Sequence, residues 1–85
     1  MNINLINYKF FRRRYIIYES NGKGREYHGF DDSLLYEGEY LNGERNGKGK
    51  EYYPNGELEF EGEYLNGKRN GKGKAYYEGK LIFEG

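Results

Sequence analysis

Residues 36–58 read YEGEYLNGERNGKGKEYYPNGEL, and residues 60–81 read FEGEYLNGKRNGKGKAYYEGKL. These segments are two copies of one unit, because the string EGEYLNG begins at Glu37 and returns at Glu61, a period of 24 residues. The string NGKG also occurs earlier in the chain, at Asn21. Self-similarity at a period of this length predicts stacked copies of one supersecondary unit, each of which buries its apolar side against the next.

Alternation within each unit is typical of β-strands whose two faces differ. The fold class that follows is all-β: a single-layer, twisted antiparallel β-meander of repeated hairpins, with about six or seven strands. One face carries rings and glycines, at Tyr36, Tyr40, Tyr53, Leu58, Phe60, Tyr64 and Tyr77 and at Gly38, Gly49, Gly62 and Gly73. The opposite face carries charges whose sign alternates from strand to strand, at Glu37, Glu39, Lys48, Lys50, Glu59, Glu61, Glu63, Lys72 and Lys74.

The predicted register depends on the turn between the first two strands of a unit. The residues NGERNG, 42–47, have turn composition throughout, and we expect one six-residue loop there. This loop places Tyr40 opposite Gly49. It also places Tyr36 opposite Tyr53. Glycine inside a strand normally weakens it, so we expect each such glycine to make room for a ring from the neighbouring strand.

The unit resembles the MORN (membrane occupation and recognition nexus) repeat in its aromatic-Glu-Gly-Glu-aromatic start and in its spaced glycines, which end in Gly-x-Gly. The resemblance implies a sheet of hairpins, and a use like that of cytoskeletal and membrane-associated scaffolds or of accessory regions in lipid kinases and methyltransferases. The units that we assign on this basis are two repeats at residues 36–59 and 60–82, a degenerate first unit at 11–35, the start of a truncated further repeat at 83–85 and an N-terminal edge segment at 1–10.

Composition narrows the classes of function. Fourteen Lys+Arg residues balance fourteen Asp+Glu residues, so no net field attracts nucleic acid. The chain has no cysteine and one histidine, His28, whose place in the repeat puts it among the rings rather than beside a nucleophile. We therefore expect a protein that is not an enzyme, uses no cofactor or metal, and binds no nucleic acid.

The leading hypothesis for function is a non-catalytic scaffold or protein-interaction module. A lone sheet leaves one face without a covering layer, and exposed apolar surface of this kind marks interaction sites. The ring face or an open strand edge would then bind a protein partner or a second copy of the chain. The candidate residues on the ring face are Tyr36, Tyr40, Tyr53, Phe60, Tyr64 and Tyr77.

A basic cluster in the degenerate first unit supports an alternative, in which FRRRY replaces the YEGEY of the later units. The cluster consists of Arg12, Arg14, Lys23 and Arg25. These charges either protect an edge strand from aggregation or contact anionic phospholipid headgroups at a membrane surface. A further hypothesis treats the chain as a fragment of a longer array without activity of its own. The N-terminal residues lack the pattern of a signal peptide, so we expect a cytoplasmic protein, free or peripheral at a membrane or the cytoskeleton.

Overall fold

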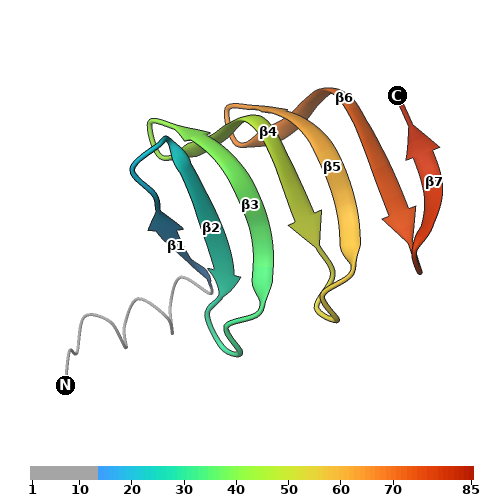
Figure 1. Cartoon of the computed structure of the whole chain (residues 1–85), viewed down its shortest axis with the longest axis horizontal. Helices are drawn as coiled ribbons and strands as arrows, with labels where there is room; N and C mark the ends of the chain where they lie inside the picture. The colour runs from blue at the N-terminus through green and yellow to red at the C-terminus, as the bar shows by residue number, and fades with distance from the viewer. Residues whose placement is uncertain (1–13) are drawn as a thin grey trace.

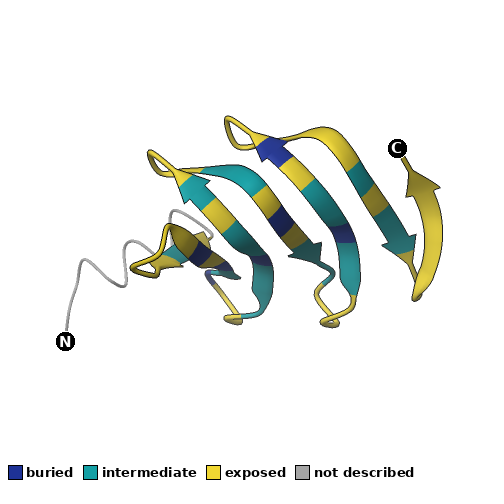
Figure 2. Ribbon diagram, turned by 45° about the horizontal axis from the view of Figure 1, so that its top comes forward, coloured by how far each residue is buried: buried dark blue, intermediate teal, exposed yellow. Residues whose placement is uncertain are grey.

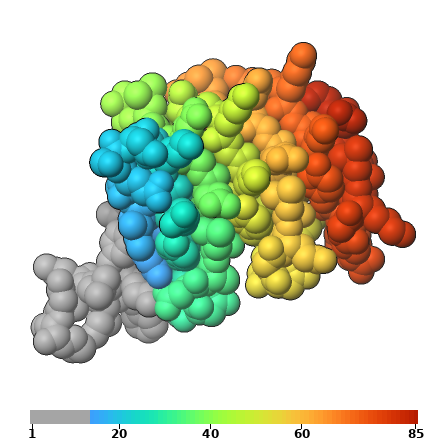
Figure 3. All heavy atoms as spheres, viewed as in Figure 1, coloured from blue at the N-terminus to red at the C-terminus, as the bar shows by residue number. Residues whose placement is uncertain are grey.

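The computed structural model describes residues 14–85, which form a single antiparallel sheet of seven strands that pair in chain order (Figure 1). The all-β meander of hairpins predicted from the sequence is confirmed. Successive strands follow one another across the molecule (Figure 3). The edge segment predicted at residues 1–10 and Arg12 lie outside the described residues. The strands are β1 (Arg14–Tyr18), β2 (Lys23–His28), β3 (Leu34–Leu41), β4 (Glu44–Tyr52), β5 (Leu58–Leu65), β6 (Lys68–Tyr77) and β7 (Lys80–Glu84).

The turn between β3 and β4 has two residues, so the six-residue loop predicted at 42–47 is wrong. Asn42 and Gly43 have φ angles of 51° and 81°. Two successive positive φ angles are those of a type I′ turn, whose twist matches the flanking strands and which favours Asn-Gly. The Asn66–Gly67 pair repeats the same turn between β5 and β6, with φ angles of 52° and 84°.

The rest of the expected loop is a β-bulge inside β4. Gly38 pairs with Gly49 and Tyr40 with Arg45, so Glu39 stands opposite the extra residues of β4. The bulge leaves Lys48 without a paired residue in the β3–β4 ladder. The Glu39 carboxylate accepts a hydrogen bond of 3.3 Å from the backbone N–H of Lys48. The bulge therefore uses an acidic side chain of the charged face to satisfy the backbone.

These turns change the register that we predicted around β4. Tyr36 pairs with Glu51 rather than with Tyr53, and Tyr40 with Arg45 rather than with Gly49. The predicted pairing was wrong because the extra residues of the bulge were counted as part of the turn.

A second bulge moves two residues of β5 from the faces on which the sequence placed them. Leu58 pairs with Tyr52, whose hydroxyl donates to Glu37 on the charged face, so Leu58 belongs to that face. Glu59 is the extra residue, and its carboxylate instead lies 3.6 Å from the guanidinium of Arg69 on the ring side. Simple alternation fails wherever a bulge adds a residue to one strand.

The expected contact between rings and glycines is confirmed. A Cβ added to Gly49 would overlap the ring of Tyr36, and one added to Gly73 would overlap the ring of Phe60. A Cβ on Gly24 would lie only 2.9 Å from Cε1 of Tyr40. A ring thus lies on the backbone of the adjacent strand at a place that only glycine leaves open.

Three of these rings form the core of the single layer. Tyr36, Phe60 and Tyr64 are 0%, 6% and 3% exposed. The ring of Tyr64 meets Tyr36 and Phe60 edge to face, at centroid separations of 5.1 Å and 5.8 Å. Edge-to-face pairs of this kind add about 0.5–1.5 kcal/mol beyond their buried area. Figure 2 shows buried residues in the inner strands and a fully exposed β7.

We predict that Gly49→Val and Gly73→Val each prevent stable folding, because a branched side chain would take the space of the ring above it. Overpacking of this kind costs about 1–3 kcal/mol or more, a large share of the stability of a small domain. Lys50→Val is the matched control, since it places the same side chain on the exposed charged face of β4. Thermal unfolding followed by circular dichroism measures the effect, and an unchanged melting temperature in Gly49→Val would contradict the ring–glycine contact.

Candidate interaction surfaces

Arginines cover the rings of the core. The guanidinium carbon of Arg45 lies 4.3 Å from the centroid of the Tyr36 ring, and that of Arg69 lies 4.2 Å from the Phe60 ring. A guanidinium above an aromatic face gains cation–π attraction and shields the ring from water. The full exposure that we expected for this face is therefore wrong at Tyr36 and Phe60, because side chains of the same sheet take the place of a second layer.

Each arginine is held by a glutamate of the preceding unit. Arg45 donates to both carboxylate oxygens of Glu26, at 2.8 Å and 3.0 Å, and the hydroxyl of Tyr40 donates to the same carboxylate at 2.8 Å. The Glu26 side chain is only 4% exposed. Such a bidentate contact fixes the orientation of both side chains. It therefore links β2 to the hairpin of β3 and β4.

The same arrangement recurs one unit later. Arg69 and the Tyr64 hydroxyl donate to the Glu51 carboxylate at 2.8 Å and 2.6 Å. These four charged residues were not predicted as a group from the sequence, although the repeat contained the signal. Glu26 and Glu51 occupy the same position after the NGKG motifs that begin at Asn21 and Asn46. Arg45 and Arg69 directly precede the motifs that begin at Asn46 and Asn70.

The pairing sets the ionisation of the buried carboxyls. Burial acts to raise the pKa of Glu26, but the hydrogen bonds and charge of Arg45 and the hydroxyl of Tyr40 outweigh it, so this pKa lies below its ordinary value. Glu51 behaves alike: Arg69 and Tyr64 overcome burial and lower the pKa of the carboxyl. Both groups are thus ionised at neutral pH.

The candidate ring residues fall into two groups by exposure. Tyr36, Phe60 and Tyr64 are buried, so a partner has no access to them in this structure. Tyr40 and Tyr53 are half-buried, and Tyr77 is 57% exposed. The rings of Tyr53 and Tyr77 meet edge to face at 6.2 Å. Ring surface that remains available thus lies at the end of β6, beside β7.

The basic residues of the first unit lie near carboxylates. Arg14 is 3.6 Å from Glu26, and Arg25 is 3.6 Å from both Glu19 and Glu37. Lys23 pairs with Glu39 across the β2–β3 ladder. Arg25 likewise stands opposite Glu37 of β3, and Arg14 stands opposite His28 of β2. The cluster is therefore largely compensated within the described residues.

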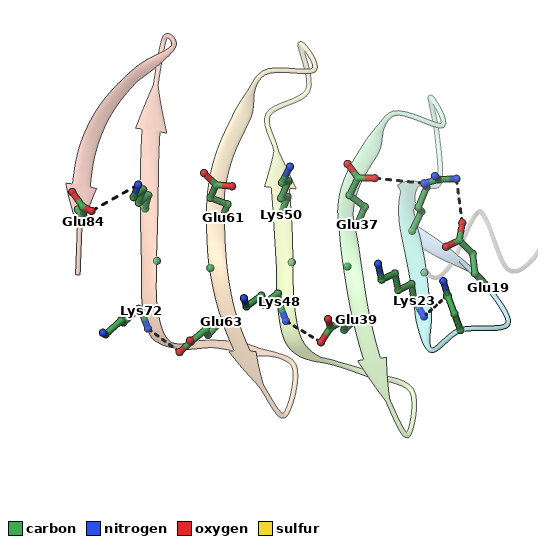
Figure 4. A pocket seen from close by; sticks show the side chains of 18 of the residues that line it. Glu19, Lys23, Glu37, Glu39, Lys48, Lys50, Glu61, Glu63, Lys72 and Glu84 are labelled. Atoms are coloured by element: carbon green, nitrogen blue, oxygen red, sulfur yellow. Dashed lines mark hydrogen bonds and ion pairs between the residues drawn. The ribbon is translucent and has the colours of Figure 1, made fainter.

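The charged face forms an open trough of about 1050 Å³ across the sheet. Figure 4 shows acidic and basic side chains of successive strands lying beside one another, with Glu37, Lys50 and Glu61 in strand order. Each basic row has an acidic neighbour, so the trough presents no continuous field of one sign. Residues 14–85 contain no group of three or more side chains suited to hold a metal ion, and no helix long and apolar enough to cross a bilayer.

The longest run of exposed apolar residues in the described part of the chain lies on β7. Within the described part of the chain this strand pairs with β6 alone. Its consecutive residues Leu81, Ile82 and Phe83 are 50%, 64% and 58% exposed. An edge strand presents unpaired N–H and C=O groups, and apolar side chains make it a template for another strand. This run of three exposed apolar residues was not predicted from the sequence.

Comparison with known proteins identifies the repeating unit. The family model of the MORN repeat matches twice, at residues 36–57 and 60–81. Searches of the curated proteins and of the solved structures gave no match.

We predict that Glu26→Gln lowers the free energy of unfolding at pH 7 by about 3 kcal/mol, because it leaves the half-buried Arg45 without its carboxylate. The folded-state pKa of Glu26 lies below its ordinary value of 4.5, so its contribution is complete above about pH 4.5 and disappears as the pH falls through the folded-state pKa. The wild type should therefore lose stability on acidification, and Glu26→Gln should lose less.

Urea unfolding at pH 7 and at acidic pH measures both effects. Glu44→Gln serves as the control, since Glu44 is exposed at the start of β4. An equal acid dependence in the wild type and in Glu26→Gln would show that this carboxyl does not link pH to stability.

Proposed function

The chain belongs to the MORN repeat family, and on that premise we propose that it is a non-catalytic scaffold module that binds a protein partner by adding a strand of the partner to the edge of β7. The observation that supports the proposal is the exposure of Leu81, Ile82 and Phe83 on a strand with one neighbour in residues 14–85. Strand addition uses backbone hydrogen bonds for affinity and side chains for specificity.

The position of the exposed rings favours the edge over the ring face. Arg45 and Arg69 cover the inner rings, whereas Tyr77 is exposed and pairs with Lys80 at the start of β7. Apolar side chains from β6 and β7 thus lie at the same end of the sheet. Tyrosines beside an apolar strand are typical of the centre of protein interfaces.

Anionic phospholipid is the competing candidate, through the basic cluster of the first unit. Arg14 and Arg25 have exposed side chains, at 62% and 50%, which favours this hypothesis. Their carboxylate neighbours oppose it, because each arginine that contacts a lipid phosphate must give up a glutamate. A polybasic segment gains about 1 kcal/mol per basic residue at such a surface, and the acidic neighbours reduce this gain.

We predict that the protein does not sediment with vesicles of phosphatidylserine and phosphatidylcholine, at low or at high salt. The expectation follows from the carboxylates near Arg14 and Arg25. Vesicles of phosphatidylcholine alone provide the background. Sedimentation at low salt that is lost at high salt, and lost also in Lys23→Glu, would favour the lipid hypothesis instead.

We predict that the wild type binds a dye for exposed apolar surface, and that Ile82→Lys reduces this binding because it removes an exposed apolar side chain from the edge. A lysine on an edge strand discourages pairing with another strand. Leu41→Lys is the matched control, because Leu41 is 58% exposed but lies at the end of β3, away from the β7 edge. Dye fluorescence reports the result, and a wild type that does not bind the dye would contradict the proposal.

A further inference from the structure

Strand β7 pairs with β6 in the same way as β5 pairs with β4. Phe83, Glu84 and Gly85 repeat the sequence of Phe60, Glu61 and Gly62. Their pairing repeats as well: in β6·β7, Ala75 and Lys74 stand opposite Phe83 and Glu84. Gly85 and Gly73 exchange two backbone hydrogen bonds, of 2.7 Å and 3.0 Å. The side of β7 that faces β6 is thus fully paired. The pairing of β5 with β6 shows which residues the other side of β7, its outer side, is suited to bind.

The ring at the start of this motif lies over two glycines in β5 and over one in β7. Phe60 lies over Gly62 of its own strand and over Gly73 of the next strand. Phe83 lies over Gly85 in the same way, since a Cβ on Gly85 would be 2.8 Å from Cζ of Phe83. In residues 14–85 no further strand follows, and the exposure rises from 6% for Phe60 to 58% for Phe83. Phe83 therefore lacks a glycine on its outer side.

The acidic residue of the motif lacks a partner on the same side. Glu61 stands between Lys50 of β4 and Lys74 of β6. Glu84 has Lys74 at 3.8 Å, and its side chain is 61% exposed. Because opposite charges on directly paired residues stabilise a ladder, the position outside Glu84 favours a basic residue.

The outer edge of β7 nevertheless differs from the side of β5 that pairs with β6. Arg69 covers Phe60 and is held by Glu51 and Glu59. Ala75 and Ile82 occupy the equivalent positions beside Phe83. An arginine above Phe83 would thus meet apolar side chains instead of two carboxylates. The side chain that covers Phe83 is accordingly apolar.

We infer that the outer edge of β7 binds an extended protein segment with a glycine opposite Gly85, a lysine or arginine opposite Glu84, and an apolar residue above Phe83. A second copy of the chain does not offer this pattern, because the described edge strands read RYIIY in β1 and KLIFE in β7. The occupant is a heterologous strand of a partner protein. The inference rests on the proposed function and adds the chemistry of the partner.

The test uses the full-length chain labelled with nitrogen-15 and a peptide of the β6 sequence, Lys68–Tyr77, that carries Arg69→Leu. The backbone amide signals of Phe83, Glu84 and Gly85 report binding at the edge. We expect these signals to shift with this peptide, and the unchanged β6 peptide to bind several-fold more weakly. Gly73→Val in the peptide should abolish binding, and Lys74→Glu should weaken it about tenfold. In the protein, Glu84→Lys should reverse the preference between the lysine and glutamate peptides.

The outcomes separate the inference from the proposed function. Equal shifts of β7 with all peptides would overturn the specificity while leaving strand addition at this edge intact. Shifts at β7 that grow with protein concentration in the absence of peptide would mean that a second copy is the occupant, against the inference. An absence of any β7 shift, with every peptide and at every protein concentration, would overturn the inference and the proposed function together.

Discussion

The fold depends on an aromatic ring whose outer end lies against the backbone of the next strand at a glycine. Any other residue would place a Cβ where the rings of Tyr36 and Phe60 lie. Because the ring descends to the backbone, it is buried by a single layer of strands, without a second sheet or a helix. A domain of this size has little surface to bury, and this contact lets it bury its largest side chains.

The charged residues on the ring side complete the burial and join the units. Arg45 lies over Tyr36 and is held by Glu26 of the preceding unit, and Arg69 lies over Phe60 and is held by Glu51. The arginine that lies over the ring of each unit is thus positioned by a glutamate of the preceding unit. Such coupling between adjacent units is the basis of stability in repeat proteins. At β7 the pattern ends with Ala75 in the place of the glutamate, and the ring of Phe83 is exposed.

The sequence was sufficient for the architecture but not for the register. The period and the alternation predicted the hairpins, the two unlike faces and the ring–glycine contact, because each depends on local spacing. The Asn42–Gly43 turn was misjudged because two Asn/Gly-containing segments in a row form one turn and one bulge, and composition alone does not separate them. The burial of Tyr36 was not predicted because it depends on Arg45, which lies over the ring. The alternation of residues along a strand does not reveal such a contact between side chains. The apolar character of the β7 edge emerged only from the exposure of Ile82 and its neighbours.

Proton NMR of the glycine Hα atoms tests the ring–glycine contact most directly, in the unmodified protein. Gly49 and Gly73 should show nuclear Overhauser effects from their Hα protons to the ring protons of Tyr36 and Phe60, because a Cβ added to these glycines would overlap Cε1 and Cζ of those rings. Gly56 and Gly79 provide the internal reference, because a Cβ added to either would have no atom within 4 Å. If Gly49 and Gly73 show no such effects, like the reference glycines, the rings do not lie on the neighbouring strand, and the account of this fold is contradicted.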